Sequence, residues 1–221
     1  MHRGVQERLL VFLREFEGVR RGMYVDRVGL VTAGIGFMFR TADDATNLAW
    51  WHPANRIATR REILDEWQRV KSGTRAVEGQ SPLLLAQSTV DRAFATQVRM
   101  REQILSQVFT KWNEFPADAQ LGLLAHSWLF ASRAAIEAWQ GGRYAAAVRE
   151  GRWKNAGELS LWEAIRNPSQ TRQANRAAGM RRMFDNAAIV DEAIKRGAGQ
   201  LGDILYFPQD ARPAVLIRER R

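Results

Sequence analysis

Three side chains near the N-terminus have the types and the spacing that acid–base chemistry needs. They are Glu17, Asp26 and Thr32, separated by eight and five residues. Hydrolysis of a glycosidic bond uses two carboxyl groups. One gives its proton to the leaving oxygen, and the other stays ionised to activate water or to stabilise a cationic transition state. The residue types therefore predict a hydrolytic pair, Glu17 and Asp26, with the Thr32 hydroxyl beside it.

The sequence around these residues predicts the elements that position them. Apolar residues recur with a helical period over about residues 3–16, so we expect a helix that leads to Glu17. Gly18 can take the left-handed conformation that ends a helix. Residues 23–26 and 30–35 are typical of two short strands joined around Gly29. Glu17 is then expected at a helix end, and Asp26 and Thr32 on the strands of a hairpin.

This stretch resembles the phage-type lysozymes, the muramidases of glycoside hydrolase family 24. Besides the spacing of the three residues, the elements that carry the resemblance are Glu17-Gly18, Tyr24-Val25-Asp26 and Thr32-Ala33-Gly34-Ile35-Gly36. The resemblance implies an inverting mechanism in which Glu17 is the general acid, Asp26 polarises the attacking water and Thr32 holds that water. It also implies that Tyr24 and Gly36 bind substrate or support the catalytic residues. A general acid must keep its proton near neutral pH, which needs a partly desolvated site that raises its pKa.

A second match lies far downstream, where Asn167-Pro168 precedes Gln173-Ala174-Asn175-Arg176-Ala177. In the family, an Asn-Arg-Ala sequence starts a C-terminal helix, and its arginine approaches the catalytic glutamate. The resemblance therefore implies supporting roles for Asn175 and Arg176, with Arg176 orienting Glu17. An ordinary exposed arginine in a basic helix is the alternative. The resemblance covers about residues 1–40 and 88–187.

The chain also departs from the family pattern. Phe37 follows Gly36 where family members commonly carry a histidine, which questions the local packing more than the chemistry. Residues 41–87 match poorly and read as an elaborated small lobe. They include Trp50 and Trp51, which either stack on sugar rings or pack under the lobe. The tail from Gly197 lies outside the match.

The composition limits the kinds of function that the chain can have. The chain has 221 residues, of which 46% are hydrophobic, and it has no cysteine. Disulfides, a thiolate nucleophile and a thiolate metal site are therefore excluded. No His/Asp/Glu cluster has metal-ligand spacing, so we expect neither a metal nor a cofactor. His126 lies in a nearly all-apolar stretch and is interpreted as a core or cleft histidine.

The sequence also suggests where the protein acts. No apolar run is long enough to span a bilayer, so stable membrane insertion is not expected. The N-terminus has no secretory apolar segment, and we expect a protein made in the cytoplasm without a cleavable signal peptide. Such a protein would act in the periplasm or cell wall of a target bacterium or host, after release by a phage or a secretion machine.

The formal net charge of +9 implies an anionic partner. We expect peptidoglycan glycan strands as that partner, an immunity or delivery protein as a further candidate, no nucleic acid, and a monomer. Two alternatives to a muramidase stay open: a lysozyme-fold protein that binds peptidoglycan without cleaving it, and a basic nucleic-acid-binding module.

The predicted fold class is α+β, a single lysozyme-like domain with a cleft between two lobes. The small, strand-containing lobe covers about residues 18–87, and the larger helical lobe covers about 1–17 and 88–200, followed by an extension over 197–221. Strand signals are confined to the N-terminal fifth. A long helix is expected over about 89–109, a buried helix over 117–130, and two separate helices over 169–185 and 187–196.

Overall fold

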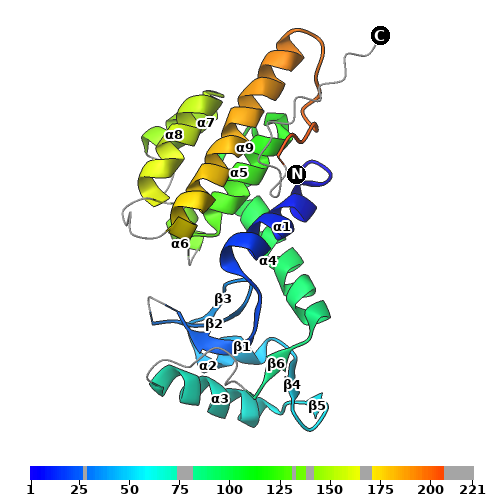
Figure 1. Ribbon diagram of the computed structural model, residues 1–221, viewed down its shortest axis with the longest axis vertical. Coiled ribbons are helices and arrows are strands. Elements are labelled where there is room, and N and C mark those ends of the chain that lie inside the picture. The colour runs from blue at the N-terminus through cyan, green and yellow to red at the C-terminus, as the bar shows by residue number, and fades with distance from the viewer. Residues whose placement is uncertain (27–28, 74–81, 131–132, 138–141, 165–170, 207–221) are drawn as a thin grey trace. The chain divides into compact units, whose positions relative to one another are not determined.

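The computed structural model describes residues 1–26, 29–73, 82–130, 133–137, 142–164 and 171–206 (Figure 1). The strands are β1 (Arg20–Val25), β2 (Val31–Gly34), β3 (Phe37–Phe39), β4 (Trp50–His52), β5 (Arg56–Ile57) and β6 (Leu84–Leu85). The helices are α1 (Val5–Glu17), α2 (Ala42–Thr46), α3 (Arg60–Ser72), α4 (Gln87–Val108), the 3₁₀ turn η1 (Trp112–Glu114), α5 (Ala117–Ser127), α6 (Arg133–Glu137), α7 (Arg143–Arg149), α8 (Trp153–Ala164) and α9 (Thr171–Lys195).

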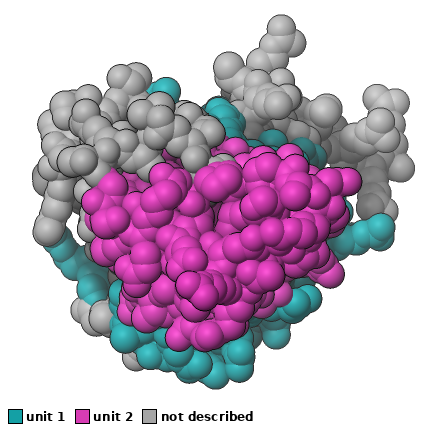
Figure 2. All heavy atoms as spheres, turned by 90° about the horizontal axis from the view of Figure 1, so that it is seen from below, with its two compact units in different colours: residues 1–16, 98–221 teal, residues 17–97 magenta. Residues whose placement is uncertain are grey.

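The chain divides into two compact units. One comprises residues 1–16 and 98–221, and the other comprises residues 17–97 (Figure 2). All strands of the described residues belong to the smaller unit, whereas the described elements of the larger unit are helical. The predicted α+β class is therefore confirmed. The cleft between two lobes stays a prediction.

The strands of the smaller unit form one antiparallel sheet in the order β3-β2-β1-β6-β4-β5. One face of the sheet is its core face. Val31 pairs with Phe39, and Trp50 pairs with Leu85, and all four side chains are buried. Directly opposed residues in antiparallel strands point to the same face, so each of these pairs packs into the core as a unit.

The prediction that strands are confined to the N-terminal fifth is wrong. β4, β5 and β6 lie beyond it, and they have only two or three residues each. Such short strands show no alternation of apolar and polar residues. Their existence depends on pairing with one another and, through β6, with β1.

Helix α3 begins with a capping box made by Thr59 and Glu62. The Thr59 hydroxyl accepts from the Glu62 N–H, and the Glu62 carboxylate accepts from the Thr59 N–H. This reciprocal pair satisfies two backbone donors that a helix start leaves unpaired. The helix then buries Ile63, Trp67 and Val70 on one face.

Helix α5 lies in the core of the larger unit, and every residue from Ala117 to Ser127 is buried. Phe184 of α9 packs tightly against two glycines. A Cβ added at Gly122 of α5 would lie 3.0 Å from the Phe184 ring, and one added at Gly157 of α8 would lie 3.2 Å from the Phe184 Cβ. Close approach of α9 to both helices therefore depends on the small size of these two residues. No helix among the described residues is long and apolar enough to cross a membrane.

The two helices predicted over residues 169–185 and 187–196 are one continuous helix, α9. Neither proline nor a left-handed glycine interrupts the chain between Thr171 and Lys195. Gly179 stays helical, and the Phe12 and Tyr206 side chains occupy the space above it, 2.8 and 2.9 Å from a built Cβ. Tertiary packing thus stabilises one continuous helix where the local sequence pattern predicted two.

The segment after α9 is fastened to the start of α5. Leu205 and Tyr206 donate their N–H groups to the two carboxylate oxygens of Asp118, over 2.7 and 3.2 Å. The Ala117 N–H donates to the Leu201 carbonyl over 2.7 Å. Asp118 is fully buried, and this desolvation raises the pKa of its carboxyl to about 7. The described part of the C-terminal extension is therefore integral to the helical unit.

Candidate active site

The β1–β2 hairpin brings Asp26 beside Thr32. Tyr24 pairs with Thr32 and Val25 with Val31, so Asp26 stands just after the end of β1 rather than on the strand as predicted. The Asp26 N–H donates to the Leu30 carbonyl over 2.8 Å, which continues the pairing by one step into the turn.

The Asp26 carboxylate is oriented by the turn that it begins. Its Oδ1 accepts the Leu30 N–H over 2.8 Å. The Thr32 hydroxyl lies 3.3 Å from Asp26 Oδ2, and also 3.3 Å from the Leu30 carbonyl oxygen. A hydroxyl carries one proton and two lone pairs, so Thr32 can donate to either acceptor and still accept from a third group. The structure therefore brings together two of the three residues predicted for catalysis.

A lysine outside the predicted site supports the same turn. Lys71, in the last turn of α3, donates from Nζ to the Gly29 carbonyl over 2.6 Å. Gly29 itself has a φ of 80°, a left-handed conformation that favours glycine. No sequence signal links Lys71 to this turn, because the two are far apart along the chain.

Two further glycines fix the path of the chain after Thr32. Gly34 and Gly36 have φ values of 64° and 75°. The Phe37 ring lies against Gly34, and a Cβ built at Gly34 would be 2.4 Å from its Cδ2. Phe37 thus fills the space above the backbone. It is a buried packing residue, 6% exposed, at the position where phage-type lysozymes commonly carry a histidine.

Glu17 is the last residue of α1, and Gly18 follows it with a φ of 71°. The predicted helix end at Gly18 is confirmed. The Glu17 side chain lies outside the described part of the structure, so the separation of its carboxyl group from Asp26 stays a prediction.

Arg176 lies on α9 in the larger unit, and only 7% of it is exposed. The alternative interpretation as an exposed arginine is therefore wrong. Its Nη2 donates to the Ala125 carbonyl over 3.1 Å, and burial lowers its pKa to about 10. Asn175 is exposed, and α9 begins at Thr171 rather than at Asn175. The approach of Arg176 to Glu17 stays a prediction.

The other candidate side chains have clear surroundings. Tyr24 is half-buried, and the Arg20 guanidinium lies 4.6 Å from the centre of its ring. His126 is fully buried, with its ring 4.9 Å from that of Tyr144, so the interpretation as a core histidine is confirmed. No group of three or more His, Asp or Glu side chains in the described part of the chain is arranged to hold a metal ion.

The two tryptophans of the extra segment have different environments. Trp50 is fully buried, and its indole N–H donates to the Ala45 carbonyl over 2.8 Å. Trp51 is 38% exposed. Trp50 therefore belongs to the core of the small unit, and only Trp51 is available to a ligand.

Comparison with known proteins gives a distant structural likeness. No protein-family model matches the chain, and no curated protein matches its sequence. Among solved structures, the chain is similar to the endolysin from Escherichia coli O157:H7 phage FAHEc1. The TM-score is 0.48 at 12% identity, over 82% of this chain and 90% of that chain. At this distance no residue role passes from the endolysin to this protein.

Proposed function

We propose that this protein is a muramidase, which hydrolyses the β-1,4 bond between N-acetylmuramic acid and N-acetylglucosamine in bacterial peptidoglycan. The observation that carries the proposal is the contact between Thr32 Oγ1 and Asp26 Oδ2 on the β1–β2 hairpin. It joins a carboxylate and a hydroxyl directly after a helix that ends in a second acidic residue, Glu17. The order and spacing of the three residues resemble those of the phage-type lysozymes.

The proposed reaction uses inversion. The Glu17 carboxyl group gives its proton to the glycosidic oxygen as the bond from the anomeric carbon to that oxygen breaks. Water attacks the anomeric carbon from the opposite face of the sugar, and its proton passes to the Asp26 carboxylate. The new carbon–oxygen bond replaces the old one, and neither a metal nor an oxidant is consumed.

The hairpin supports the second half of this reaction. The Leu30 N–H binds Asp26 Oδ1 and holds the carboxylate in one orientation, with Oδ2 toward Thr32. The hydroxyl and the carboxylate oxygen are 3.3 Å apart and in direct contact, so one water placed beside them can reach both. Thr32 is 3% exposed, so its hydroxyl is held in place by the surrounding packing.

The position of Glu17 supports the first half. The last turn of a helix carries the negative end of the helix dipole, which disfavours a negative charge there. Glu17 occupies the final position of α1. A general acid that has to stay protonated near neutral pH is therefore favoured at this place in the fold.

The proposed site of action is the periplasm or cell wall of a target bacterium or host. Peptidoglycan lies outside the cytoplasm, and the net charge of +9 favours an anionic surface of that kind.

The decisive test is wall clearing by the Glu17→Gln variant. We expect the wild-type protein to reduce the turbidity of purified peptidoglycan and the variant to lose at least a hundredfold of that rate, with an unchanged circular dichroism spectrum and Tm. Glu7→Gln, at another acidic position of α1, is the matched control and should keep the wild-type rate.

The stereochemistry of the product gives an independent test. Proton NMR during hydrolysis should show the α-anomer of the new reducing end forming first. A β-anomer would assign a retaining mechanism and overturn the water-activating role of Asp26. Binding of wild-type protein to peptidoglycan without any product would instead identify a non-catalytic wall-binding protein.

A further inference from the structure

The outer face of the sheet carries a row of side chains that leads away from Thr32. Thr32 pairs with Tyr24, Gly22 pairs with Leu84, Leu84 with Trp51, and Trp51 with Ile57. Directly opposed residues share a face. The pairing of β1 with β2 shifts register between Arg20 and Tyr24, so the link from Gly22 to Tyr24 rests on burial: Met23 between them is 3% exposed, whereas Gly22 and Tyr24 are half-buried. We call the five side chains Thr32, Tyr24, Leu84, Trp51 and Ile57 the outer strip.

Burial supports this assignment of faces at the apolar end of the strip, whereas Thr32 at the other end is only 3% exposed. Trp50 and Leu85, the neighbours of Trp51 and Leu84, point the other way and are fully buried. In contrast, Leu84, Trp51 and Ile57 are 39%, 38% and 51% exposed. Three of the exposed large hydrophobic side chains in the described residues therefore stand side by side on three adjacent strands.

The outer strip has a length suited to a polymer. Adjacent strands lie about 4.8 Å apart, so the three steps from β2 to β4 cover about 14 Å. Gly22 stands opposite Leu84 and has no side chain, and the Arg20 guanidinium lies 4.6 Å from the centre of the Tyr24 ring at that end of the strip. The strip thus connects the candidate catalytic hydroxyl with an exposed indole.

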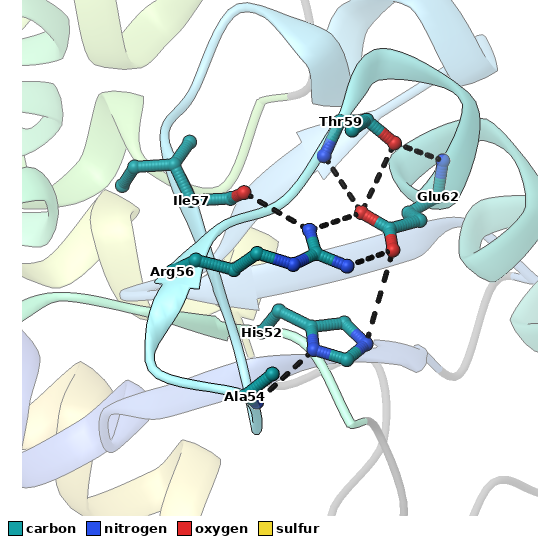
Figure 3. A network of polar contacts seen from close by, with 6 residues as sticks. All are labelled: His52, Ala54, Arg56, Ile57, Thr59 and Glu62. Atoms are coloured by element: carbon teal, nitrogen blue, oxygen red, sulfur yellow. Dashed lines mark hydrogen bonds and ion pairs between the residues drawn. The ribbon is translucent and has the colours of Figure 1, made fainter.

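The chemistry of the apolar end favours an uncharged ligand. Arg56 and His52 pair across β5 and β4 and alternate with Ile57 and Trp51, so they point away from the strip. Figure 3 shows both turned toward Glu62: Arg56 Nη1 donates to Glu62 Oε2 over 2.8 Å, and His52 Nε2 lies 3.9 Å from Oε1. The Arg56 guanidinium and the His52 imidazole are thus directed to a carboxylate on the other face, and Arg21, on the strand beside β6, donates from Nε to the Leu85 carbonyl. An anionic wall polymer would find no cation presented by Leu84, Trp51 or Ile57.

We propose that the outer strip binds a glycan chain that extends from the Asp26–Thr32 site, with one sugar ring stacked on Trp51. A pyranose ring presents a face of C–H bonds that packs against an indole, while its hydroxyl groups stay in water. The identity of the glycan as peptidoglycan rests on the proposed muramidase function. Protein docking is disfavoured, because a stable interface uses about 20–30 residues on each side, far more than this row provides.

The test is titration of the full chain with peptidoglycan oligosaccharides of two lengths, a disaccharide and a long chain, followed by tryptophan fluorescence and calorimetry. Trp51→Ala should weaken binding of the long chain about tenfold and leave disaccharide binding unchanged. Trp51→Phe should recover most of the loss. Ile189→Ala, which removes a 44% exposed side chain from α9, is the matched control and should bind as wild type.

A kinetic readout separates this proposal from the proposed function. On cell walls, Trp51→Ala should raise the apparent KM about tenfold and leave kcat unchanged. Wild-type kinetics in Trp51→Ala would refute glycan binding by the outer strip without affecting the proposed muramidase activity. If Trp51→Ala weakens long-chain binding but the wild-type protein never cleaves peptidoglycan, glycan binding by the outer strip is supported and the proposed muramidase activity is refuted. A dimer in light scattering that Trp51→Ala abolishes would assign the strip to self-association instead.

Discussion

At the residue scale, the candidate site combines a short-range pair with side chains that are distant in sequence. Asp26 and Thr32 meet because a tight turn at Gly29 separates them. Lys71 reaches the same turn from α3, and binds the Gly29 carbonyl. The pair is thus held from both sides, by its own hairpin and by a helix of the same unit.

Thr32→Ala should separate catalysis from stability. We expect peptidoglycan clearing to fall at least a hundredfold, because the variant loses the hydroxyl that holds water beside Asp26. The free energy of unfolding should fall by about 1 kcal/mol, since one modest hydrogen bond is lost. Thr32→Ser keeps the hydroxyl and should keep most of the activity. An alanine variant that clears walls at the wild-type rate would remove Thr32 from the mechanism.

Asp118 should make the stability of the protein depend on pH. Its pKa is raised from the ordinary 3.8 to about 7 by burial, so between these values the folded protein holds a proton that the unfolded chain has released. The free energy of unfolding should therefore fall as the pH rises from about 4 through 7, by a few kcal/mol in total. Urea denaturation at several pH values measures the slope. Asp118→Asn has no proton to lose and should flatten it; an equal slope in the variant would exclude Asp118 as the cause.

At the element scale, glycines shape the connections around the candidate site. Gly18, Gly29, Gly34 and Gly36 all have positive φ values. Gly18 follows the end of α1, Gly34 is the last residue of β2, and Gly29 and Gly36 lie in the connections of the β1–β3 meander. Gly34 carries a second constraint, because the Phe37 ring occupies the volume where its Cβ would stand.

Gly34→Ala should destabilise the smaller unit more than Gly29→Ala does. Both substitutions place a Cβ at a positive φ, which costs on the order of 1 kcal/mol. Only at Gly34 does the new Cβ meet another group, since nothing lies within 4 Å of a Cβ at Gly29. We expect Gly34→Ala to cost about 1–3 kcal/mol more by denaturant unfolding.

A double-mutant cycle identifies the cause of that difference. Phe37→Ala removes the ring, so adding Gly34→Ala to it should cost no more than Gly29→Ala costs alone. Additive effects of Gly34→Ala and Phe37→Ala would show that the Phe37 ring does not cause the extra loss.

At the scale of the whole molecule, charge and apolar surface suggest separate contributions to wall binding. The net charge of +9 acts over long range and is screened by salt, whereas stacking on Trp51 acts at contact. We propose that the first attracts the protein to an anionic wall and that the second holds a neutral sugar.

Sedimentation with insoluble cell walls at low and high salt tests this division. Binding of the wild-type protein should weaken with rising salt, and Trp51→Ala should weaken binding by the same factor at every salt concentration. Duplex DNA titrated over the same salt range tests the alternative of a nucleic-acid-binding module, for which we expect only weak, salt-sensitive binding. A sequence-dependent duplex affinity that survives high salt would favour that module over a muramidase.

The amino-acid sequence alone determined the features that depend on residues close together in the chain. The end of α1 at Gly18, the hairpin around Gly29, the Thr59–Glu62 capping box and the buried helix α5 all follow from local patterns. Their interactions span a few residues, or one helical face, and a linear pattern records them.

Only the tertiary structure decided what depends on partners far away in the chain. Adjacent residues Trp50 and Trp51 are of one type, yet register with Leu85 and Leu84 buries one and exposes the other. Arg176 is buried against α5, where its Nη2 donates a hydrogen bond to the Ala125 carbonyl. Helix α9 stays continuous at Gly179, where Phe12 and Tyr206 pack against it. Whether a side chain is buried depends on which surfaces pack together, and this depends on the whole fold rather than on neighbouring residues in the sequence.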